Sequence, residues 1–150
     1  MNPILLFIFT KLASILGLLG AIAIIILWLL LHGQHETSFI LLCITLGLTT
    51  TVTLLKKVFK VPRPTSATLT LSSYSFPSGH AAGATFLAMV LVILARNLTP
   101  LLWYLIVFIC SLTAFSISYS RLLLKVHTLF QVSVGVSLGL LFGWVFTALL

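Results

Sequence analysis

Long apolar runs are the feature of this sequence that most restricts its fold. Four of them reach or approach the roughly 18 residues needed to cross a bilayer, and they cover Leu12–Leu31, Ser38–Leu55, Leu101–Tyr119 and Thr128–Leu150. A fifth run, Gly79–Ala95, is shorter and begins with small residues. Because only 6% of the residues are charged, the chain cannot present the surface of a soluble protein. We therefore predict an all-α, polytopic membrane bundle of about five transmembrane helices.

The remaining sequence indicates one continuous bundle. No internal repeat, low-complexity tract or interdomain linker is evident, so we expect a single membrane-embedded domain over residues 1–150. The first residues, up to Lys11, are expected to extend the first span or to lie along the interface. A cleaved signal peptide fits poorly, because the apolar run is longer than an h-region and no basic segment precedes it. Cys43 and Cys110 fall inside predicted spans, so no disulfide is expected.

Small residues recur along the last two spans. Gly135, Gly139 and Gly143 are spaced every four residues in the last span, a pattern that lets transmembrane helices approach closely. We interpret this stripe as a packing face, and it leaves room for a homo-oligomer. Hydroxyl side chains recur in the fourth span, at Ser111, Thr113, Ser116 and Ser118. We expect these hydroxyl groups to donate hydrogen bonds between helices.

The charges are distributed unevenly along the chain. Its net charge is +7, but without a basic tail or a basic amphipathic helix it does not predict a nucleic-acid partner. If the spans alternate in direction, seven of the eight basic residues lie at one membrane face: Lys11, Lys56, Lys57, Lys60, Arg63, Arg121 and Lys125. Glu36, the single carboxylate side chain, falls at the other face with His32 and His35, in a spacing that does not predict a metal site.

Three polar segments emerge at the basic face. They are "KKVFKVPRP" (56–64) after the second span, "PSGH" (77–80) before the third, and "SRLLLKVH" (120–127) between the fourth and fifth. Two prolines disfavour helix between residues 56 and 78, so we expect an extended or re-entrant segment there. Unpaired positive charges near a membrane are costly unless an anion joins them. A phosphate group suits the guanidinium and ammonium groups of these segments.

The "PSGH" segment adds main-chain donors. Pro77 suits the start of a helix, and Ser78, Gly79 and His80 are then expected to present free N–H groups to an anion. Two histidines beside a phosphate suggest a nucleophile and a proton donor. His127 is the better candidate for the nucleophile, because Gln131 lies four residues on and shares its helical face. The amide oxygen of Gln131 is expected to accept from one ring nitrogen and direct the other toward the substrate.

In this order, the three segments resemble the signature of the type 2 phosphatidic acid phosphatase superfamily. Members of this superfamily are integral-membrane lipid phosphate phosphatases. The resemblance covers about residues 38–150 and implies a catalytic core of four helices. It also implies hydrolysis of a lipid phosphate or pyrophosphate monoester through a phosphohistidine, with no metal and no cofactor. Bacterial members usually have the active site at the periplasmic face of the inner membrane, and we expect the same orientation here.

The resemblance also implies roles for individual residues. By this resemblance, the phosphoryl group is bound by Lys56, Arg63 and Arg121. Ser78 and Gly79 assist them, His80 is the general acid and His127 is the nucleophile. The expected partners are therefore a lipid phosphate and the surrounding membrane lipids. Phosphatidic acid, phosphatidylglycerol phosphate, polyprenyl pyrophosphate and lipid A phosphate remain open as substrates, and so does phosphoryl transfer to an acceptor other than water.

The sequence departs from the family pattern in two places. In "HTLFQ", Gln131 stands where the family has an aspartate. An amide can orient the ring of His127 but cannot stabilise an imidazolium as a carboxylate does. This leaves a second hypothesis, a catalytically weakened protein that binds phosphate headgroups or handles lipids. Bacterial members typically have six spans, so we also expect this chain to lack one span at its N-terminus.

Overall fold

The described part of the chain is entirely helical. The computed structural model describes residues 15–64 and 74–150, and these form five α-helices without a strand. They are α2 (Ile15–Leu31), α3 (His35–Phe59), α4 (Gly79–Leu94), α5 (Pro100–Leu123) and α6 (Leu129–Leu149). Each helix corresponds to one predicted span, which confirms the prediction of an all-α membrane bundle. Leu12 and Lys11, at the expected start of the first span, lie outside the described residues.

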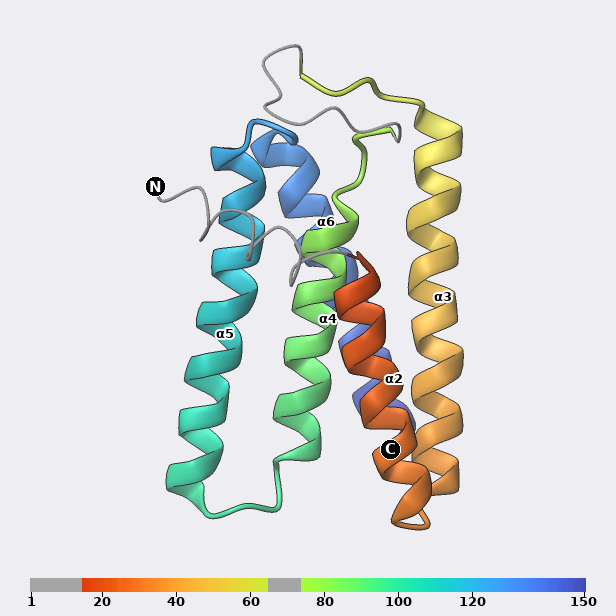
Figure 1. Ribbon diagram of the computed structural model, residues 1–150, viewed down its shortest axis with the longest axis vertical. Coiled ribbons are helices and arrows are strands. Elements are labelled where there is room, and N and C mark those ends of the chain that lie inside the picture. The colour runs from red at the N-terminus through yellow and green to blue at the C-terminus, as the bar shows by residue number, and fades with distance from the viewer. Residues whose placement is uncertain (1–14, 65–73) are drawn as a thin grey trace.

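The helices alternate in direction along the bundle (Figure 1). By length and composition, α3, α5 and α6 are able to cross a membrane, and α2 and α4 are shorter apolar helices. The chain is therefore an integral membrane protein. Because of the alternation, α3 and α5 end, and α4 and α6 begin, at the same end of the bundle (Figure 1). We call this the site end, since all three polar segments belong to it.

The boundary between α3 and the following segment differs from the sequence prediction. The polar segment was expected to leave the helix near Lys56, but α3 continues through Phe59. Lys60 is the C-cap, with a left-handed φ of 48°, and its N–H still donates to the carbonyl of Lys56 at 3.1 Å. Pro62 restricts the conformation of its neighbour Val61 and not of earlier residues, so the helix persists up to that point. Lys56 is therefore presented by a rigid helix.

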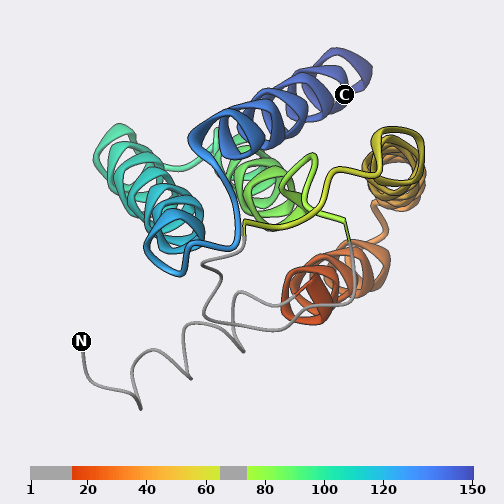
Figure 2. The ribbon, with the colours of Figure 1, turned by 90° about the horizontal axis from the view of Figure 1, so that it is seen from above.

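Helix α4 occupies the centre of the bundle (Figure 2). Its most extensive contacts are with α6 and α5, and it also touches α2 and α3. Small side chains at its start, including the buried Ala81 and Ala82, allow this close packing. Farther along, Phe86 and Val90 are completely buried and join Phe146 of α6 in the apolar core.

The glycine stripe of α6 packs within the chain, against α4. A Cβ atom added at Gly139 would lie 2.5 Å from the carbonyl oxygen of Ala82 and 2.7 Å from Cβ of Thr85. A Cβ atom at Gly135 would collide with the carbonyl oxygen of Ser78. The prediction of a packing face is thus confirmed, and the stripe lets the start of α6 approach the start of α4.

The hydroxyl groups of α5 do not behave as the sequence suggested. Thr113 and Ser116 donate to carbonyl groups of their own helix, each at 2.7 Å, so the prediction that they link helices is wrong. A short hydroxyl side chain reaches the carbonyl four residues back more readily than it reaches a neighbouring helix. Among the described residues, the hydroxyl of Ser118 is the one buried side-chain polar group without a hydrogen-bond partner.

Candidate active site

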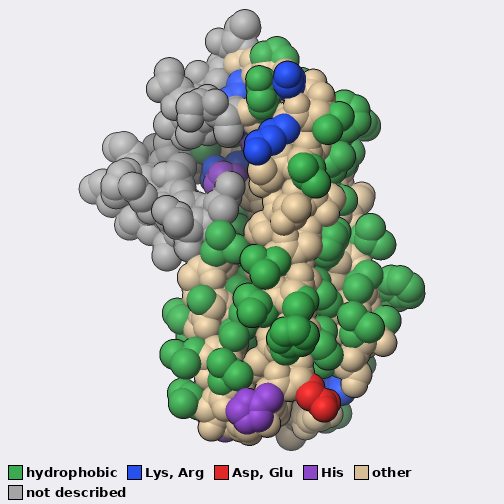
Figure 3. Space-filling view, turned by 90° about the vertical axis from the view of Figure 1, so that its right-hand side faces the viewer, with side chains coloured by type: hydrophobic (Ala, Val, Ile, Leu, Met, Phe, Trp, Pro, Cys, Tyr) green, Lys and Arg blue, Asp and Glu red, His purple; other side chains and the backbone are tan. Residues whose placement is uncertain are grey.

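The site end collects every residue that the sequence singled out for phosphate chemistry. They are Lys56 in the last turn of α3, Arg63 in the segment after it, Ser78, Gly79 and His80 at the start of α4, Arg121 in the last turn of α5, and His127 and Gln131 around the start of α6. Glu36 lies in the first turn of α3, about 30 Å from Lys56 at 1.5 Å per residue. Figure 3 shows the acidic side chain and the main group of basic side chains at opposite ends of one largely apolar face.

The cations of the site end have no acidic side chain to neutralise them. Arg121 is 3% exposed, and its guanidinium donates to the hydroxyl of Ser120 at 3.0 and 3.1 Å. Lys56 donates to the carbonyl of Tyr74 at 2.7 Å. The positive charges of Lys56, Arg63 and Arg121 all act on the ring of His80, so all three lie within electrostatic range of it. Partly buried cations in this arrangement favour binding of an anion.

A tight turn after α5 places His127 in the site. Lys125 has a φ of 52°, and the N–H groups of Lys125 and Val126 donate to the carbonyls of Leu122 and Arg121 at 2.9 and 3.2 Å. This pair of bonds is the Schellman arrangement, which usually has glycine at the left-handed position. The turn reverses the chain, and Arg63 then binds the Val126 carbonyl at 3.1 Å.

Each nitrogen of the His127 ring has a distinct environment. Nδ1 lies 2.8 Å from the carbonyl oxygen of Ser75 and 3.2 Å from Oε1 of Gln131. Both partners are acceptors, so Nδ1 carries the proton and Nε2 has the free lone pair. Nε2 faces the guanidinium of Arg63, with 3.4 Å between it and Nη1. The ring therefore directs an unprotonated nitrogen toward the guanidinium of Arg63.

The predicted contact between Gln131 and His127 is present, and Gln131 also caps the start of α6. Thr128 is the N-cap of α6, its hydroxyl accepts from the Gln131 N–H at 3.4 Å, and its own N–H donates to Oε1 of Gln131 at 3.1 Å. These reciprocal bonds form a capping box. One amide oxygen thus fixes both the start of α6 and the ring of His127.

Ser75 was missed by the sequence analysis. It is completely buried, and besides its carbonyl contact to His127 its hydroxyl lies 3.1 Å from Nε2 of Gln131. The same hydroxyl lies 2.7 Å from the carbonyl of Pro62 and 3.0 Å from that of Val61. No local pattern predicts these contacts, because Ser75 is far from His127 and Gln131 in the sequence.

Burial and charge keep His127 neutral. Removal from solvent, followed by the positive charge of Arg63, lowers the pKa of His127 to about 4, although its bonds to Gln131 and Ser75 oppose the shift. Burial also lowers the pKa of the Arg63 guanidinium. A histidine with this pKa is deprotonated at neutral pH, the state a nucleophile requires.

The start of α4 offers fewer main-chain donors than predicted. Pro77 lies one residue before the N-cap and not in the first turn, because the N-cap is Ser78. The N–H of Ser78 donates to the carbonyl of Gln131 at 3.0 Å and is therefore not free. The N–H groups of Gly79 and His80 have no hydrogen-bond acceptor among the described residues. The start of α4 can thus offer an anion two N–H groups and the helix dipole.

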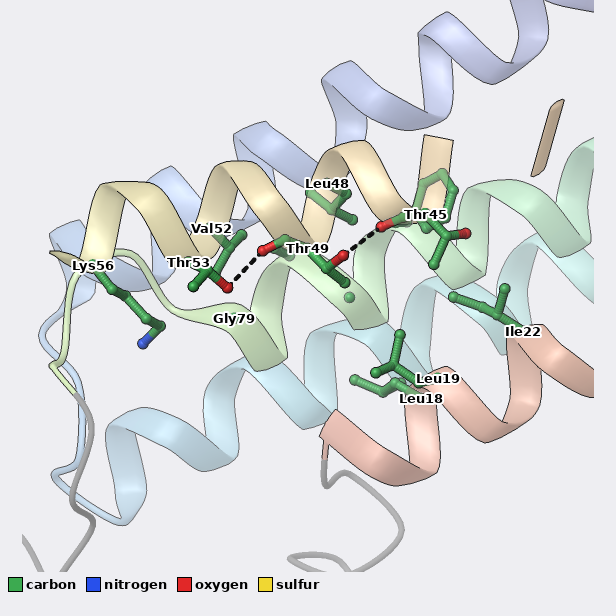
Figure 4. A pocket seen from close by; sticks show the side chains of 13 residues that line it. Leu18, Leu19, Ile22, Thr45, Leu48, Thr49, Val52, Thr53, Lys56 and Gly79 are labelled. Carbon is green, nitrogen blue, oxygen red and sulfur yellow. Dashed lines mark hydrogen bonds between the residues drawn. The ribbon is translucent and has the colours of Figure 1, made fainter. Parts of the chain in front are cut away.

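An apolar groove leads from the site end into the membrane. It has a volume of about 290 Å³ and lies between α2, α3 and α4. Lys56 and Gly79 line one end, while Leu18, Leu19 and Ile22 line its α2 side (Figure 4). Thr45, Thr49 and Thr53 line the α3 side, and each hydroxyl donates to the carbonyl four residues earlier. With their donors occupied, these threonines leave the groove compatible with a hydrocarbon chain.

Among the described residues, no three His, Cys, Asp or Glu side chains lie close enough together to hold a metal ion.

Comparisons with known proteins identify relatives of this arrangement. The family model of the PAP2 superfamily matches residues 36–150. The transmembrane PAP2 type phosphatidylglycerolphosphate phosphatase from Bacillus subtilis has a similar structure, with a TM-score of 0.85 and 26% sequence identity over 99% of this chain and 77% of that chain. The structure of Aquifex aeolicus LpxE gives a TM-score of 0.75 and 28% identity over 99% of this chain and 88% of that chain. No curated protein shows significant similarity to the chain.

Proposed function

The chain belongs to the PAP2 superfamily, and from that premise we propose that it hydrolyses a lipid phosphate or pyrophosphate through a phosphohistidine. The observation that carries the proposal is the geometry of His127. Nδ1 is held by two acceptors at 2.8 and 3.2 Å, and Nε2 faces Arg63 at 3.4 Å. A positioned, neutral imidazole beside a phosphate-binding cation is arranged for attack on phosphorus.

In the proposed first step, Nε2 of His127 attacks the phosphorus atom. An N–P bond forms while the P–O bond to the lipid breaks. His80, which is protonated once the negative charge of the bound phosphate offsets the surrounding cations, gives its proton to the departing oxygen. The lipid leaves as an alcohol, or as a monophosphate when the substrate is a pyrophosphate. Lys56, Arg63 and Arg121 neutralise the phosphoryl oxygens, and the N–H groups of Gly79 and His80 add donors.

In the second step, water attacks the phosphohistidine. His80, now neutral, takes a proton from the water as the new P–O bond forms, and the N–P bond breaks with its electrons returning to Nε2. Inorganic phosphate is released, and both histidines regain their initial protonation states. The Lys and Arg side chains supply the positive charge in both steps, so the proposed cycle uses no metal ion.

The groove beside Lys56 supports a lipid substrate. Its walls are apolar and it continues from the cationic end of the bundle between α2, α3 and α4. A phosphate headgroup would lie among the cations while part of a hydrocarbon tail follows the groove. The Bacillus subtilis relative is a phosphatidylglycerolphosphate phosphatase, which makes this lipid the first substrate to test.

The experiment is phosphate release by detergent-purified protein in excess EDTA. The panel holds phosphatidylglycerol phosphate, phosphatidic acid, a polyprenyl pyrophosphate and lipid A phosphate, with His127→Ala measured in parallel. We expect release from at least one lipid that EDTA does not inhibit and that the variant lacks. If the wild-type protein releases phosphate from none of them, or if His127→Ala remains active, the proposal is wrong.

Gln131 favours a second candidate function, in which the protein binds phosphate headgroups with little turnover. An amide cannot offset the positive charge that develops on His127, whereas the aspartate of the family pattern can. The variant Gln131→Asp separates the two candidates. A large gain in phosphate release from near zero would support the binding protein, and an unchanged, substantial rate would support the phosphatase.

We also propose that the site end faces the periplasm of a bacterial inner membrane. The excess of basic residues at this end points toward the cytoplasm under the positive-inside rule. However, Lys56, Arg63 and Arg121 are explained by phosphate binding and do not count as topology signals. The remaining basic residues leave a weaker four-to-one bias toward the cytoplasm. The usual orientation of the bacterial family supports the periplasm instead.

A further inference from the structure

We propose that Ser75 is a positioning residue for the His127 nucleophile. We also propose that Ser75 holds the amide of Gln131 so that this amide can orient the His127 ring in place of the family aspartate. This inference rests on the proposed function, because it concerns the residue that would attack phosphorus. Ser75 is completely buried at the site end, between the segment that carries Arg63 and the start of α6. It belongs to none of the three sequence segments that indicated phosphate chemistry.

The main chain of Ser75 orients the His127 ring. Its carbonyl oxygen is 2.8 Å from Nδ1, a shorter separation than the 3.2 Å between Nδ1 and the amide oxygen of Gln131. This carbonyl and the amide oxygen together fix the tautomer that leaves Nε2 unprotonated, so loss of either acceptor should populate the other tautomer. The orienting contact that an aspartate would supply is therefore divided between a carbonyl group and an amide.

The side chain of Ser75 fixes the amide of Gln131. A hydroxyl group has one hydrogen, and the carbonyls of Pro62 and Val61, at 2.7 and 3.0 Å, accept it. The oxygen of Ser75 is then left to accept from Nε2 of Gln131 at 3.1 Å. With Nε2 held in this way, Oε1 must face Nδ1 of His127. The arrangement matches an amide, since a carboxylate at position 131 has no hydrogen to donate.

Ser75 also connects His127 to the segment that carries Arg63. Its N–H donates to the carbonyl of Val61 at 2.9 Å, and its hydroxyl binds the same stretch of main chain. Arg63 follows directly and contacts both Nε2 of His127 and the carbonyl of Val126. Loss of the hydroxyl should therefore loosen the Gln131 amide and the Arg63 segment without removing a group that touches phosphate.

The test is a double-mutant cycle with Ser75→Ala, Gln131→Met and the double variant. Ser133→Ala is the matched control, because it removes an exposed hydroxyl from α6. Phosphatidylglycerol phosphate in detergent micelles is the probe. We expect Ser75→Ala to lower kcat roughly tenfold with little change in KM, as is common for residues that orient a ligand or nucleophile through another group. If Ser75 acts through Gln131, the double variant should be no slower than Gln131→Met alone.

A second readout does not depend on activity. In protein carrying ¹⁵N-labelled histidine, solid-state NMR reports the protonation of each ring nitrogen, and His127→Asn identifies the His127 signals. We expect a protonated Nδ1 and an unprotonated Nε2 in the wild type. In Ser75→Ala and in Gln131→Met we expect mixed signals, in which both tautomers of His127 are populated. Ser75→Cys keeps a side chain of the same shape but weakens its hydrogen bonds. It replaces Ser75→Ala if that variant fails to fold, and we expect the same mixture of tautomers in it.

The outcomes separate this inference from the proposed function. A wild type that releases no phosphate contradicts the proposed function, and the NMR signals still decide the role of Ser75. The inference is wrong if Ser75→Ala or Ser75→Cys has the wild-type His127 signals. It is also wrong if the losses in kcat from Ser75→Ala and Gln131→Met simply multiply in the double variant.

Discussion

His127 shows how a single residue depends on its surroundings. In water its ring would be half protonated near pH 6.5, but burial and the charge of Arg63 lower its pKa to about 4. Two acceptors on Nδ1 prevent the ring from turning, at 2.8 and 3.2 Å. Nε2 is therefore both unprotonated and correctly directed at neutral pH, which are the two properties that the proposed attack requires.

The lowered pKa of His127 predicts how stability depends on pH. The unfolded chain gains a proton on this histidine near pH 6.5, whereas the folded protein resists protonation down to about pH 4. Its contribution to stability is therefore complete above about pH 6.5 and is lost as the pH falls toward 4. Thermal unfolding in detergent should show a smaller loss of Tm over this interval for His127→Asn than for the wild type. The exposed His35 supplies the control, and a His35→Asn profile that matches His127→Asn would contradict the prediction.

At the scale of single residues, the sequence predicted some contacts and not others. The helical spacing of His127 and Gln131 predicts their contact, which is present at 3.2 Å. The pattern Thr-x-x-Gln also contains a capping box that the sequence analysis overlooked. Ser75 had no such signal, because its contacts to His127 and Gln131 arise only when the segment before α4 folds against the start of α6.

At the scale of elements, the close approach of α4 and α6 sets the geometry of the site. Gly135 lies against the carbonyl of Ser78, and the N–H of Ser78 donates to the carbonyl of Gln131 at 3.0 Å. The start of α4, which carries His80, is thereby joined to the start of α6, which follows His127. Glycine is needed in this stripe because a larger residue would separate the two helices.

The stripe predicts a contrast between two glycine substitutions. In Gly139→Ala the added Cβ would lie 2.5 Å from the Ala82 carbonyl oxygen and 2.7 Å from Cβ of Thr85. Overpacking of this kind costs about 1–3 kcal/mol, so the Tm in detergent should fall. In Gly20→Ala the new methyl group would meet no atom of residues 15–64 or 74–150 within 4 Å, and the Tm should stay the same or rise slightly. Equal effects of the two substitutions would argue against a packing role for the stripe.

The sequence predicted helix positions better than their ends. Apolar runs located each of the five helices in the described part of the chain, because length and hydropathy alone decide which segments can lie in a bilayer. The polar residues from Lys56 onward suggested that α3 ends there, but backbone hydrogen bonding carries the helix to Phe59. Likewise, the start of α4 is set by Ser78 as the N-cap, so Pro77 lies outside the helix.

At the scale of the whole molecule, alternation of the helices assembles the site from distant segments. This arrangement was predictable from sequence, since alternating spans must return every second connection to the same face. The apolar groove was not predictable, because its walls come from side chains of three helices whose mutual rotation depends on packing. The sequence therefore predicted phosphate chemistry, while the structure adds an apolar groove, which is the feature that supports the proposed lipid substrate.

The orientation of the bundle is tested by reporters fused after Leu150. Helix α6 begins at the site end and runs to the opposite end, so the fusion point lies across the membrane from the site (Figure 1). With a periplasmic site, a C-terminal green fluorescent protein should fluoresce and a C-terminal alkaline phosphatase should be inactive. An active alkaline phosphatase fusion would place the site end in the cytoplasm.

The most direct test of the central claim is to trap the phosphorylated enzyme. Protein mixed with radiolabelled phosphatidylglycerol phosphate and quenched rapidly should carry an acid-labile, base-stable phosphoryl group, as phosphohistidine does. Mass spectrometry of peptides prepared at alkaline pH should locate this group on His127, and His127→Ala should carry none. If phosphate is released while no phosphoryl group forms on His127, or if another residue carries it, the proposed mechanism is wrong.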